Sequence, residues 1–320
     1  MNTYLSVDCG GTKTAFLICG EDGKKQAEYI LGPANYIVNG LENTLAILKQ
    51  GFIKACENVK TEPVKVLHGF IALAGYGDIP DEMEKVRTHI CNLFPEMKLT
   101  VGNDTENALE GSLLGKPGIH VIAGTGTIGI GVDKTGSYIR SGGWHHLFGG
   151  DEGSGYWIGC RLLQHFTKQA DGREKKSLLY GYIMQKYKLH CPEDILKLVV
   201  EEWQWKREKI AAMSLDVWEM AGLGDDVSIG ILEEAAWELA YIIKSIYDRG
   251  DFEEPVKISY SGGVFKAMEY LKTPLEERLA VIPHVIQKPV LSPVAGGILL
   301  AMKNSGAVVT DEIIAELRQI

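Results

Sequence analysis

The hydrophobic pattern of the first third of the chain alternates between short apolar runs and longer segments of helical period. Three short apolar runs near the N-terminus predict three consecutive strands joined by turns, and helices alternate with strands after them. The predicted elements are strands 4–8, 14–19 and 26–31, helix 41–59, strand 64–73, helix 81–93, strand 99–101 and a helix after Asp104. This order predicts a mixed sheet that is covered by helices.

The same order of elements returns after residue 118. Gly and Pro punctuate the stretch Leu114–Gly118 without a periodic apolar pattern, which marks a boundary. Residues from about 174 to 223 are polar, carry tryptophans and have helical period, so we expect an inserted helical subdomain there. The other elements predicted are strands 119–124, 128–132 and 137–141, a helix from Ser154, helix 227–247, strand 256–261, a helix after Gly262, strand 279–286, helix 293–302 and a short amphipathic helix 310–320.

The two halves therefore predict an α/β protein with two domains of one plan. Three hairpin-connected strands followed by alternating helices and strands are the ribonuclease-H-like arrangement. We place the first such domain at residues 1–115 and the second at 116–307, with the helical insertion at about 174–223 inside the second. A chain of 320 residues is long enough to give both domains a sizeable core.

Each half opens with a glycine-rich turn between two strands. The turns are Gly10-Gly11-Thr12-Lys13 and Gly124-Thr125-Gly126-Thr127. Glycine lets backbone N–H groups approach phosphate oxygens, and the threonine hydroxyls add donors. One such motif would usually be only a tight turn, but two in matching positions indicate an internal duplication with a phosphate-binding loop in each half. Lys13 could add positive charge at the first loop or could equally face solvent.

Two aspartates follow or end predicted strands, where ligands of α/β proteins commonly bind. Asp8 precedes the first turn and is placed to hold Mg²⁺ through water, since Mg²⁺ prefers oxygen ligands and keeps part of its hydration shell; alone, it would read as an Asx turn. Asp104 follows strand 99–101 and is a candidate general base for an acceptor hydroxyl; alone, it would read as a helix N-cap. Gly262-Gly263 follows strand 256–261 and is either a place for adenosine to lie against backbone or a plain strand-to-helix turn.

Composition and charge narrow the class of function. The net charge of -9 argues against nucleic acid or an anionic membrane as a partner, although backbone N–H groups and Mg²⁺ can still hold a nucleotide. No apolar run is long enough to span a bilayer and the first strand begins at once, so we expect a cytoplasmic protein. The six cysteines are scattered without a CxxC pair, which gives no support for zinc or iron–sulfur ligation.

With these motifs in place, the sequence resembles the sugar-kinase, actin and heat-shock-ATPase superfamily, and within it the N-acetylglucosamine kinase family. The specific features are Gly142-Gly143-Trp144 and the run Gly150–Gly159 (GDEGSGYWIG), combined with both glycine turns, Asn103-Asp104 and Gly262-Gly263. They span nearly the whole chain in the family's order, and none would be specific alone. The resemblance implies an actin-like ATPase fold with a cleft between the domains, and a C-terminal helix 308–320 that packs on the first domain.

The resemblance also implies site roles, with ATP and Mg²⁺ as the requirements of the reaction. It assigns the base to Asp104 and sugar contacts to Asn35 and Asp151, while leaving the neighbouring Glu152 open between a sugar contact and a helix cap. Trp144 would offer an apolar face to a sugar ring or an N-acetyl methyl group. The stretch between Trp144 and Asp151 is one residue longer than the usual family form and carries His145 and His146, which we expect to donate or accept hydrogen bonds in the sugar pocket.

The function expected from these features is ATP-dependent phosphorylation of the 6-hydroxyl of N-acetylglucosamine. An N-acetylmuramic acid or dual-specificity kinase is the alternative, followed by a glucosamine kinase; a homodimer is left open. A different class, the ATPase activator of an acyl-CoA dehydratase or reductase, needs cysteines around an iron–sulfur cluster, and the isolated cysteines argue against it. A non-catalytic sugar sensor is disfavoured because both Asp8 and Asp104 are present.

Overall fold

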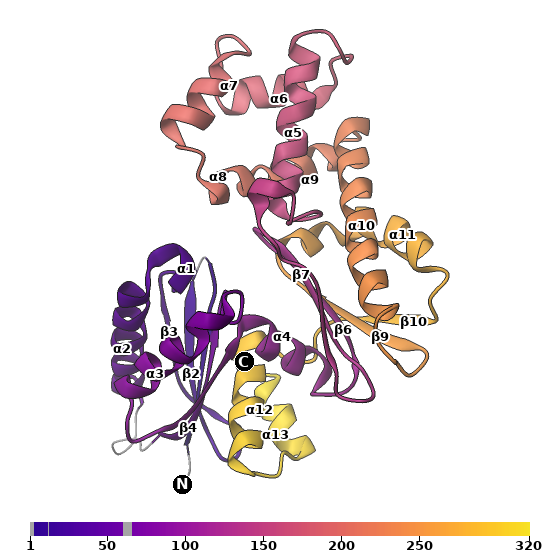
Figure 1. The fold of residues 1–320 in the computed structure, drawn as a ribbon. Coiled ribbons are helices and arrows are strands. Elements are labelled where there is room, and N and C mark those ends of the chain that lie inside the picture. The colour runs from indigo at the N-terminus through magenta and orange to yellow at the C-terminus, as the bar shows by residue number, and fades with distance from the viewer. Residues whose placement is uncertain (1–2, 12, 60–65) are drawn as a thin grey trace. The chain divides into compact units, whose positions relative to one another are not determined.

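The structure is a computed structural model that describes residues 3–11, 13–59 and 66–320 (Figure 1). The chain forms two compact units. Unit 1 comprises residues 1–116 and 288–320, and unit 2 comprises residues 117–287. Each unit is built on one five-stranded sheet covered by helices.

The sheet of unit 1 has the strand order β3-β2-β1-β4-β5. The first three strands are antiparallel neighbours, and β4 and β5 continue the sheet parallel to β1. The strands are β1 (Thr3–Cys9), β2 (Thr14–Gly20), β3 (Lys25–Leu31), β4 (Val66–Leu73) and β5 (Lys98–Asn103). The helices are α1 (Tyr36–Asn39), α2 (Leu41–Glu57), a 3-10 turn at Pro80–Glu82, α3 (Met83–Leu93), α4 (Asp104–Leu113), α12 (Pro293–Ser305) and α13 (Asp311–Leu317).

Both faces of this sheet are buried, because successive side chains of a strand point to opposite faces. Phe16 and Ile18 of β2 lie in the core with Leu48 of α2, whereas Leu17 lies in the core on the other face, with Ile298 of α12. The strand β2 is therefore buried along its whole length, as expected for a strand covered on both faces.

The sheet of unit 2 repeats the plan of unit 1. Its order is β8-β7-β6-β9-β10, with β6, β7 and β8 antiparallel and with β9 and β10 parallel to β6. The strands are β6 (Gly118–Ala123), β7 (Thr127–Val132), β8 (Tyr138–Gly142), β9 (Val256–Ser261) and β10 (His284–Gln287). The same order and the same directions in both sheets support the internal duplication that the glycine turns predict.

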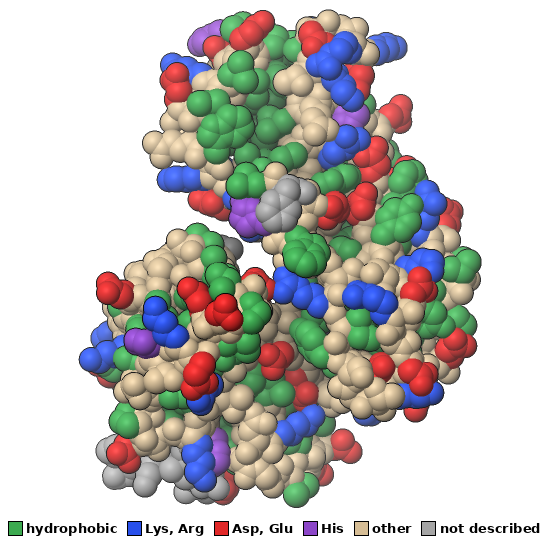
Figure 2. Space-filling view, viewed as in Figure 1, with side chains coloured by type: hydrophobic (Ala, Val, Ile, Leu, Met, Phe, Trp, Pro, Cys, Tyr) green, Lys and Arg blue, Asp and Glu red, His purple; other side chains and the backbone are tan. Residues whose placement is uncertain are grey.

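Helices account for most of the rest of unit 2. They are a 3-10 turn at His146–Phe148, α5 (Gly155–Ala170), α6 (Leu178–Lys186), α7 (Asp194–Lys197), a π-helical turn at Leu198–Glu202, α8 (Arg207–Ala212), α9 (Ser214–Gly222), α10 (Asp226–Tyr247), a 3-10 turn at Gly263–Ala267 and α11 (Met268–Leu279). Helices α6 to α9 fall within the segment for which a helical insertion was predicted. Lys and Arg side chains are interspersed with Asp and Glu side chains on the drawn face of each unit (Figure 2).

Two predictions about the C-terminal part were wrong. Residues 288–307 were placed in the second domain, but they belong to unit 1, where α12 and α13 lie beside its strands (Figure 1). The reason is the apolar face of α12, which packs on β1 and β4, while the backbone N–H of Leu291 donates to the carbonyl of Gly111 at 2.9 Å.

The strand predicted at 279–286 is the second error, because it starts later, at His284. Leu271, Leu275, Leu279 and Ile282 are all buried in the core of unit 2, and this spacing is that of a helix, so residues up to Leu279 continue α11.

Among the described residues, no helix is both long enough and apolar enough to cross a membrane.

Candidate active site

The carboxyl edge of the unit 1 sheet brings together the residues predicted for metal binding and catalysis. In the sheet register Asp8 of β1 lies opposite Ala72 of β4, which lies opposite Gly102 of β5. Asp104 comes two residues after Gly102, as the first residue of α4. The first glycine turn begins at Gly10, two residues after Asp8. Parallel strands thus place both predicted aspartates and the turn at one edge, where α/β proteins bind ligands.

Asn107 joins Asp8 to the helix that carries Asp104. Its side-chain Nδ2 donates to Oδ1 of Asp8 at 3.0 Å and to the carbonyl oxygen of Pro293 at 3.1 Å. The residue is fully buried, and its Oδ1 has no hydrogen-bond partner among the described residues. A buried amide with a specific carboxylate partner fixes the orientation of that carboxylate.

The capping role at the start of α4 belongs to Asn103 rather than to Asp104. The Asn103 side chain accepts a hydrogen bond from the N–H of Thr105 at 3.0 Å, and the Glu106 side chain accepts one from the N–H of Asn103 at 2.8 Å. This reciprocal capping box satisfies the first donors of the helix. Helix capping therefore does not account for the carboxylate of Asp104.

Burial and charge set the electrostatics at this edge. Burial raises the pKa of Asp8 above its ordinary value, and the hydrogen bond from Asn107 and the charge of Lys13 partly oppose this effect. The pKa of the buried thiol of Cys9 is raised well above its ordinary value, first by burial and then by the negative charges of Asp8 and Asp104. Cys9 is therefore an unreactive thiol beside the two carboxylates.

The first glycine turn is closed by a hydrogen bond from the N–H of Gly10 to the carbonyl of Lys13 at 2.9 Å. Gly11 and Lys13 are exposed there, and Thr12 lies outside the described residues. Asn35, predicted to contact the sugar, is the N-cap of α1: its Oδ1 accepts from the N–H groups of Ile37 and Val38 at 3.0 and 3.2 Å. Its side-chain amide nitrogen is the part that remains for the predicted role.

The second glycine turn connects β6 with β7, and its last residue is hydrogen-bonded to the side chain of Asp151. The N–H of Gly124 donates to the carbonyl of Gly126 at 2.9 Å, and the N–H of Thr127 donates to Oδ1 of Asp151 at 3.1 Å. The other carboxylate oxygen of Asp151 pairs with the guanidinium of Arg207. Asp151 does not cap α5, because Ser154 takes that role.

Gly262 follows β9 and lies against the second turn. Its φ of 103° is in the region that favours glycine, and a Cβ at this position would lie 2.9 Å from the backbone nitrogen of Gly124. His120 of β6 fastens the same end of the sheet, with its Nε2 2.9 Å from Oγ of Ser261. Burial lowers the pKa of His120 to about 3, so its imidazole is neutral at physiological pH.

The loop with the extra residue carries Trp144, His145 and His146. Its ends are tied by hydrogen bonds from the N–H of Trp144 to the carbonyl of Gly150, at 3.3 Å, and from the N–H of Gly150 to the carbonyl of His145, at 3.0 Å. The indole of Trp144 is 78% exposed. The rings of His146 and Tyr156 are in an edge-to-face contact, with 4.8 Å between their centroids. The pKa of His146 is lowered, mainly by burial and to a smaller extent by the positive charge of Arg207.

A comparison with known families gives one match over almost the full chain. Residues 5–301 match the model of the BadF/BadG/BcrA/BcrD ATPase family. The chain belongs to this family. It is 33% identical over 272 residues to an N-acetylmuramic acid/N-acetylglucosamine kinase of Clostridium acetobutylicum, covering 85% of this chain and 88% of that protein. It is 30% identical over 314 residues to an N-acetyl-D-glucosamine kinase of Dictyostelium discoideum, covering 94% of this chain and 98% of that protein.

Solved structures with low sequence identity to this chain share its fold. A protein from Chromobacterium violaceum superposes with a TM-score of 0.77 at 22% identity, covering 93% of this chain and 98% of that one. A ROK family glucokinase from Streptomyces griseus, solved with glucose and AMPPNP, gives a TM-score of 0.56 at 17% identity, with coverages of 93% and 98%. The predicted resemblance, the two-domain actin-like α/β fold and the expectation of an enzyme are confirmed.

The donor set of this family member suits Mg²⁺ only in combination with a bound phosphate. Among the described residues there is no group of three or more His, Cys, Asp and Glu side chains that could hold a metal. Mg²⁺ is commonly held by one or two carboxylates, waters and substrate phosphates rather than by an all-protein cage. Asp8 fits this mode, because one of its oxygens accepts a hydrogen bond from Asn107 and the residue lies beside the first turn.

Three residues of the site were missed from the sequence. Asn107 lies three residues after Asp104 on α4, so the two residues are neighbours on the surface of the helix, and this spacing was the one available clue. Arg207 lies in the helical segment far from Asp151 along the chain, and Tyr156 lies inside the GDEGSGYWIG run without a pattern of its own. Nothing in the local sequence connects Arg207 with the second turn.

Proposed function

We propose that this protein is an ATP-dependent amino-sugar kinase that transfers the γ-phosphate of ATP to the 6-hydroxyl of N-acetylglucosamine. The observation that carries the proposal is the meeting of Asp8, Asp104 and a glycine turn at one sheet edge, with Asn107 joining Asp8 to α4. The two relatives named as kinases of N-acetylglucosamine support the substrate class.

Asp104 is the general base in this proposal. As the sugar oxygen bonds to phosphorus, the bond between phosphorus and the bridging oxygen of ADP breaks, and ADP leaves with the electron pair. The hydroxyl proton passes to the carboxylate of Asp104, because a carboxylate at the end of a strand is placed to accept it. The N-cap of α4 is Asn103, and Asp104 is the first helical residue.

Asp8 and the glycine turns bind the nucleotide in this proposal. Mg²⁺, when bound, neutralises phosphate charge, and Asp8 would hold it through water. Asn107 holds one oxygen of Asp8 by a hydrogen bond, which fixes the orientation of the carboxylate. The backbone N–H groups of residues 10–13 and 124–127 take the phosphates, and Gly262-Gly263 takes the adenosine.

The sugar contacts are assigned to Asn35, Trp144, Asp151 and the histidine pair. The exposed indole of Trp144 can pack on an N-acetyl methyl or a sugar ring. Asp151 keeps acceptor capacity for sugar hydroxyls, since an ionised carboxylate offers about four lone-pair sites and Thr127 and Arg207 use two of them. An imidazole could also bind the lactyl carboxylate of N-acetylmuramic acid, which makes that sugar the second candidate substrate.

A coupled assay of ADP release tests the proposal on a panel of N-acetylglucosamine, N-acetylmuramic acid, glucosamine and glucose, with and without Mg²⁺. We expect Mg²⁺-dependent turnover that is fastest with an N-acetylated sugar, and a 6-phosphate product by NMR. ATP hydrolysis that ignores every sugar would contradict the kinase assignment and favour an ATPase of another kind. Equal turnover of glucose and N-acetylglucosamine would contradict the sugar pocket.

A further inference from the structure

Arg207 reaches the second glycine turn from the helical segment of unit 2. It is the first residue of α8, and its guanidinium pairs with the carboxylate of Asp151. Asp151 is only 7% exposed, and its other oxygen accepts the N–H of Thr127 at 3.1 Å. One buried carboxylate thereby connects a helix of the segment 174–223 with the backbone of the turn.

The pair fills the space directly beneath the turn. A Cβ on Gly126 would lie 2.7 Å from Oδ1 of Asp151 and would overlap the guanidinium of Arg207. The turn can rest on the ion pair only because residue 126 has no side chain. The backbone of the turn at Gly126 is therefore in direct contact with Arg207 and Asp151.

Close packing of α8 against α5 brings Arg207 to this place. A side chain on Gly159 of α5 would overlap the carbonyl group of Ile210, so the two helices approach backbone to backbone. The chain enters α8 through Gln204 and Trp205, whose φ angles of 50° and 57° are both left-handed. Such a conformation costs roughly 1–2 kcal/mol for each L-residue, and it persists where the surrounding structure fixes it.

We propose that Arg207 is a positioning residue for nucleotide binding: it holds Asp151 so that Asp151 fixes the Thr127 amide and the shape of the 124–127 turn. The inference rests on the proposed function, in which this turn binds ATP phosphates. Its physical basis is that a buried carboxylate without its cation is an uncompensated charge, which favours reorientation of the side chain. The Thr127 N–H would then lose its fixed acceptor, and the turn would lose its preformed geometry.

ATP binding measured by calorimetry without any sugar tests the role apart from catalysis. We expect Arg207→Gln to weaken ATP binding roughly 10-fold, which corresponds to losing one charge-assisted hydrogen bond. Arg207→Lys keeps the charge but not the planar fork, so it should recover part of the affinity, to roughly 3-fold weaker than wild type. The lysine variant also serves as the informative protein if the glutamine variant does not fold.

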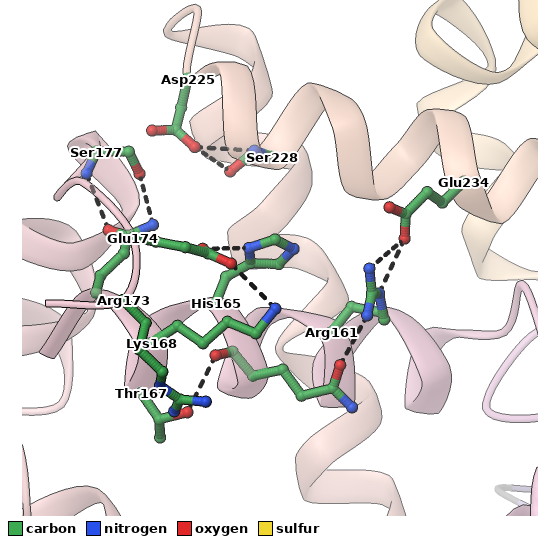
Figure 3. A network of polar contacts seen from close by, with 12 residues as sticks. Arg161, His165, Thr167, Lys168, Arg173, Glu174, Ser177, Asp225, Ser228 and Glu234 are labelled. Atoms are coloured by element: carbon green, nitrogen blue, oxygen red, sulfur yellow. Dashed lines mark hydrogen bonds and ion pairs between the residues drawn. The ribbon is translucent and has the colours of Figure 1, made fainter. Parts of the chain in front are cut away.

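Arg161 provides the matched control within the same unit. It lies on α5 and donates from Nε to Oε2 of Glu234 on α10 at 2.9 Å (Figure 3), and its side chain is 26% exposed, against 35% for Arg207. Arg161→Gln removes an arginine of similar exposure whose partner, Glu234, is 38% exposed and touches no glycine turn, so its ATP affinity should equal that of wild type.

Three results would overturn the inference. Unchanged ATP affinity in folded Arg207→Gln or Arg207→Lys, with only a lower melting temperature, would make the pair a stability device. A loss in Arg161→Gln equal to that in Arg207→Gln would show that any ion pair of α5 or α8 has the same effect. If wild type itself binds no ATP, the proposed function fails, and this inference fails with it.

Discussion

The two glycine turns occupy equivalent places in sheets of the same order, but their carboxylates come from different sources. In unit 1 the carboxylate is part of the strand itself, since Asp8 stands two residues before Gly10. The residue two positions before Gly124 in unit 2 is Ile122, and the carboxylate there comes from Asp151, outside the hairpin. The backbone plan was duplicated, and the chemistry on it was not.

The partners of the two carboxylates differ in the same way. Asp8 receives a hydrogen bond from a neutral amide, Asn107, and burial keeps its pKa raised. Asp151 is paired with the cation Arg207 and with a backbone N–H. A carboxylate that is buried without a paired cation is costly for the fold and available for a ligand, whereas a carboxylate neutralised by arginine is suited to holding backbone in place. We therefore expect loss of the Asp8 carboxylate to lower turnover without destabilising the fold, and loss of the Asp151 carboxylate to destabilise the fold.

Asp104→Asn is expected to have the largest effect. Turnover should fall by roughly 10²–10⁴-fold, the usual scale for losing a general base, while the sugar still binds. Steady-state kinetics together with calorimetric sugar binding would measure both quantities. Asp311→Asn is a matched control, because Asp311 is likewise the first residue of a unit 1 helix behind a capping residue, Thr310. Near-normal turnover of Asp104→Asn would remove this residue from the catalytic role.

Asp8→Asn should combine a large loss of turnover, roughly 100-fold or more, with a gain in stability. The pKa of Asp8 in the folded protein lies above its ordinary value, so the folded state binds the proton more tightly than the unfolded state does. Its effect on stability is therefore favourable at low pH and lost as the pH rises through the folded pKa. The melting temperature of Asp8→Asn should exceed that of wild type at pH 7 and approach it toward pH 4.

Asp151→Asn tests the contrast with Asp8→Asn, because it is expected to lower the melting temperature at pH 7 and not to raise it. It leaves Arg207 without its ionised partner, so the variant should melt below wild type at pH 7. Calorimetric melting of both variants at pH 4 and pH 7 makes the measurement. Stabilisation by both substitutions, or by neither, would show that the two carboxylates do not differ in the way described.

Local patterns predicted most of the strands, both turns and the place of Asp104 at the start of a helix, because each depends on residues close together in the sequence. The apolar runs of β1 and β2 and the Asn103-Asp104 pair are examples. The missed features depend on long-range contacts: Asn107 meets Asp8 across 99 residues, and Arg207 meets Asp151 across 56. The return of α12 to unit 1 is of the same kind, since an apolar helix face does not name the sheet on which it packs.

The smallest expected effect compares one glycine from each turn. Gly11 is exposed, and an added Cβ would have no atom of the described residues within 4 Å, whereas on Gly126 it would lie 2.7 Å from Oδ1 of Asp151. Gly11→Ala should therefore leave the melting temperature within about 1 °C of wild type. Gly126→Ala should lower it by roughly 2–8 °C, because overpacking costs about 1–3 kcal/mol.

The Michaelis constants complete this last comparison. A methyl group on Gly11 stands where phosphate oxygens would approach the backbone, so the KM for ATP should rise a few-fold with no loss of stability. In Gly126→Ala the rise in KM for ATP should accompany the lower melting temperature, since the displaced partner is the carboxylate that holds Thr127. Equal melting temperatures for the two variants would mean that the second turn yields as easily as the first, and the ion pair beneath it would then not be what fixes its shape.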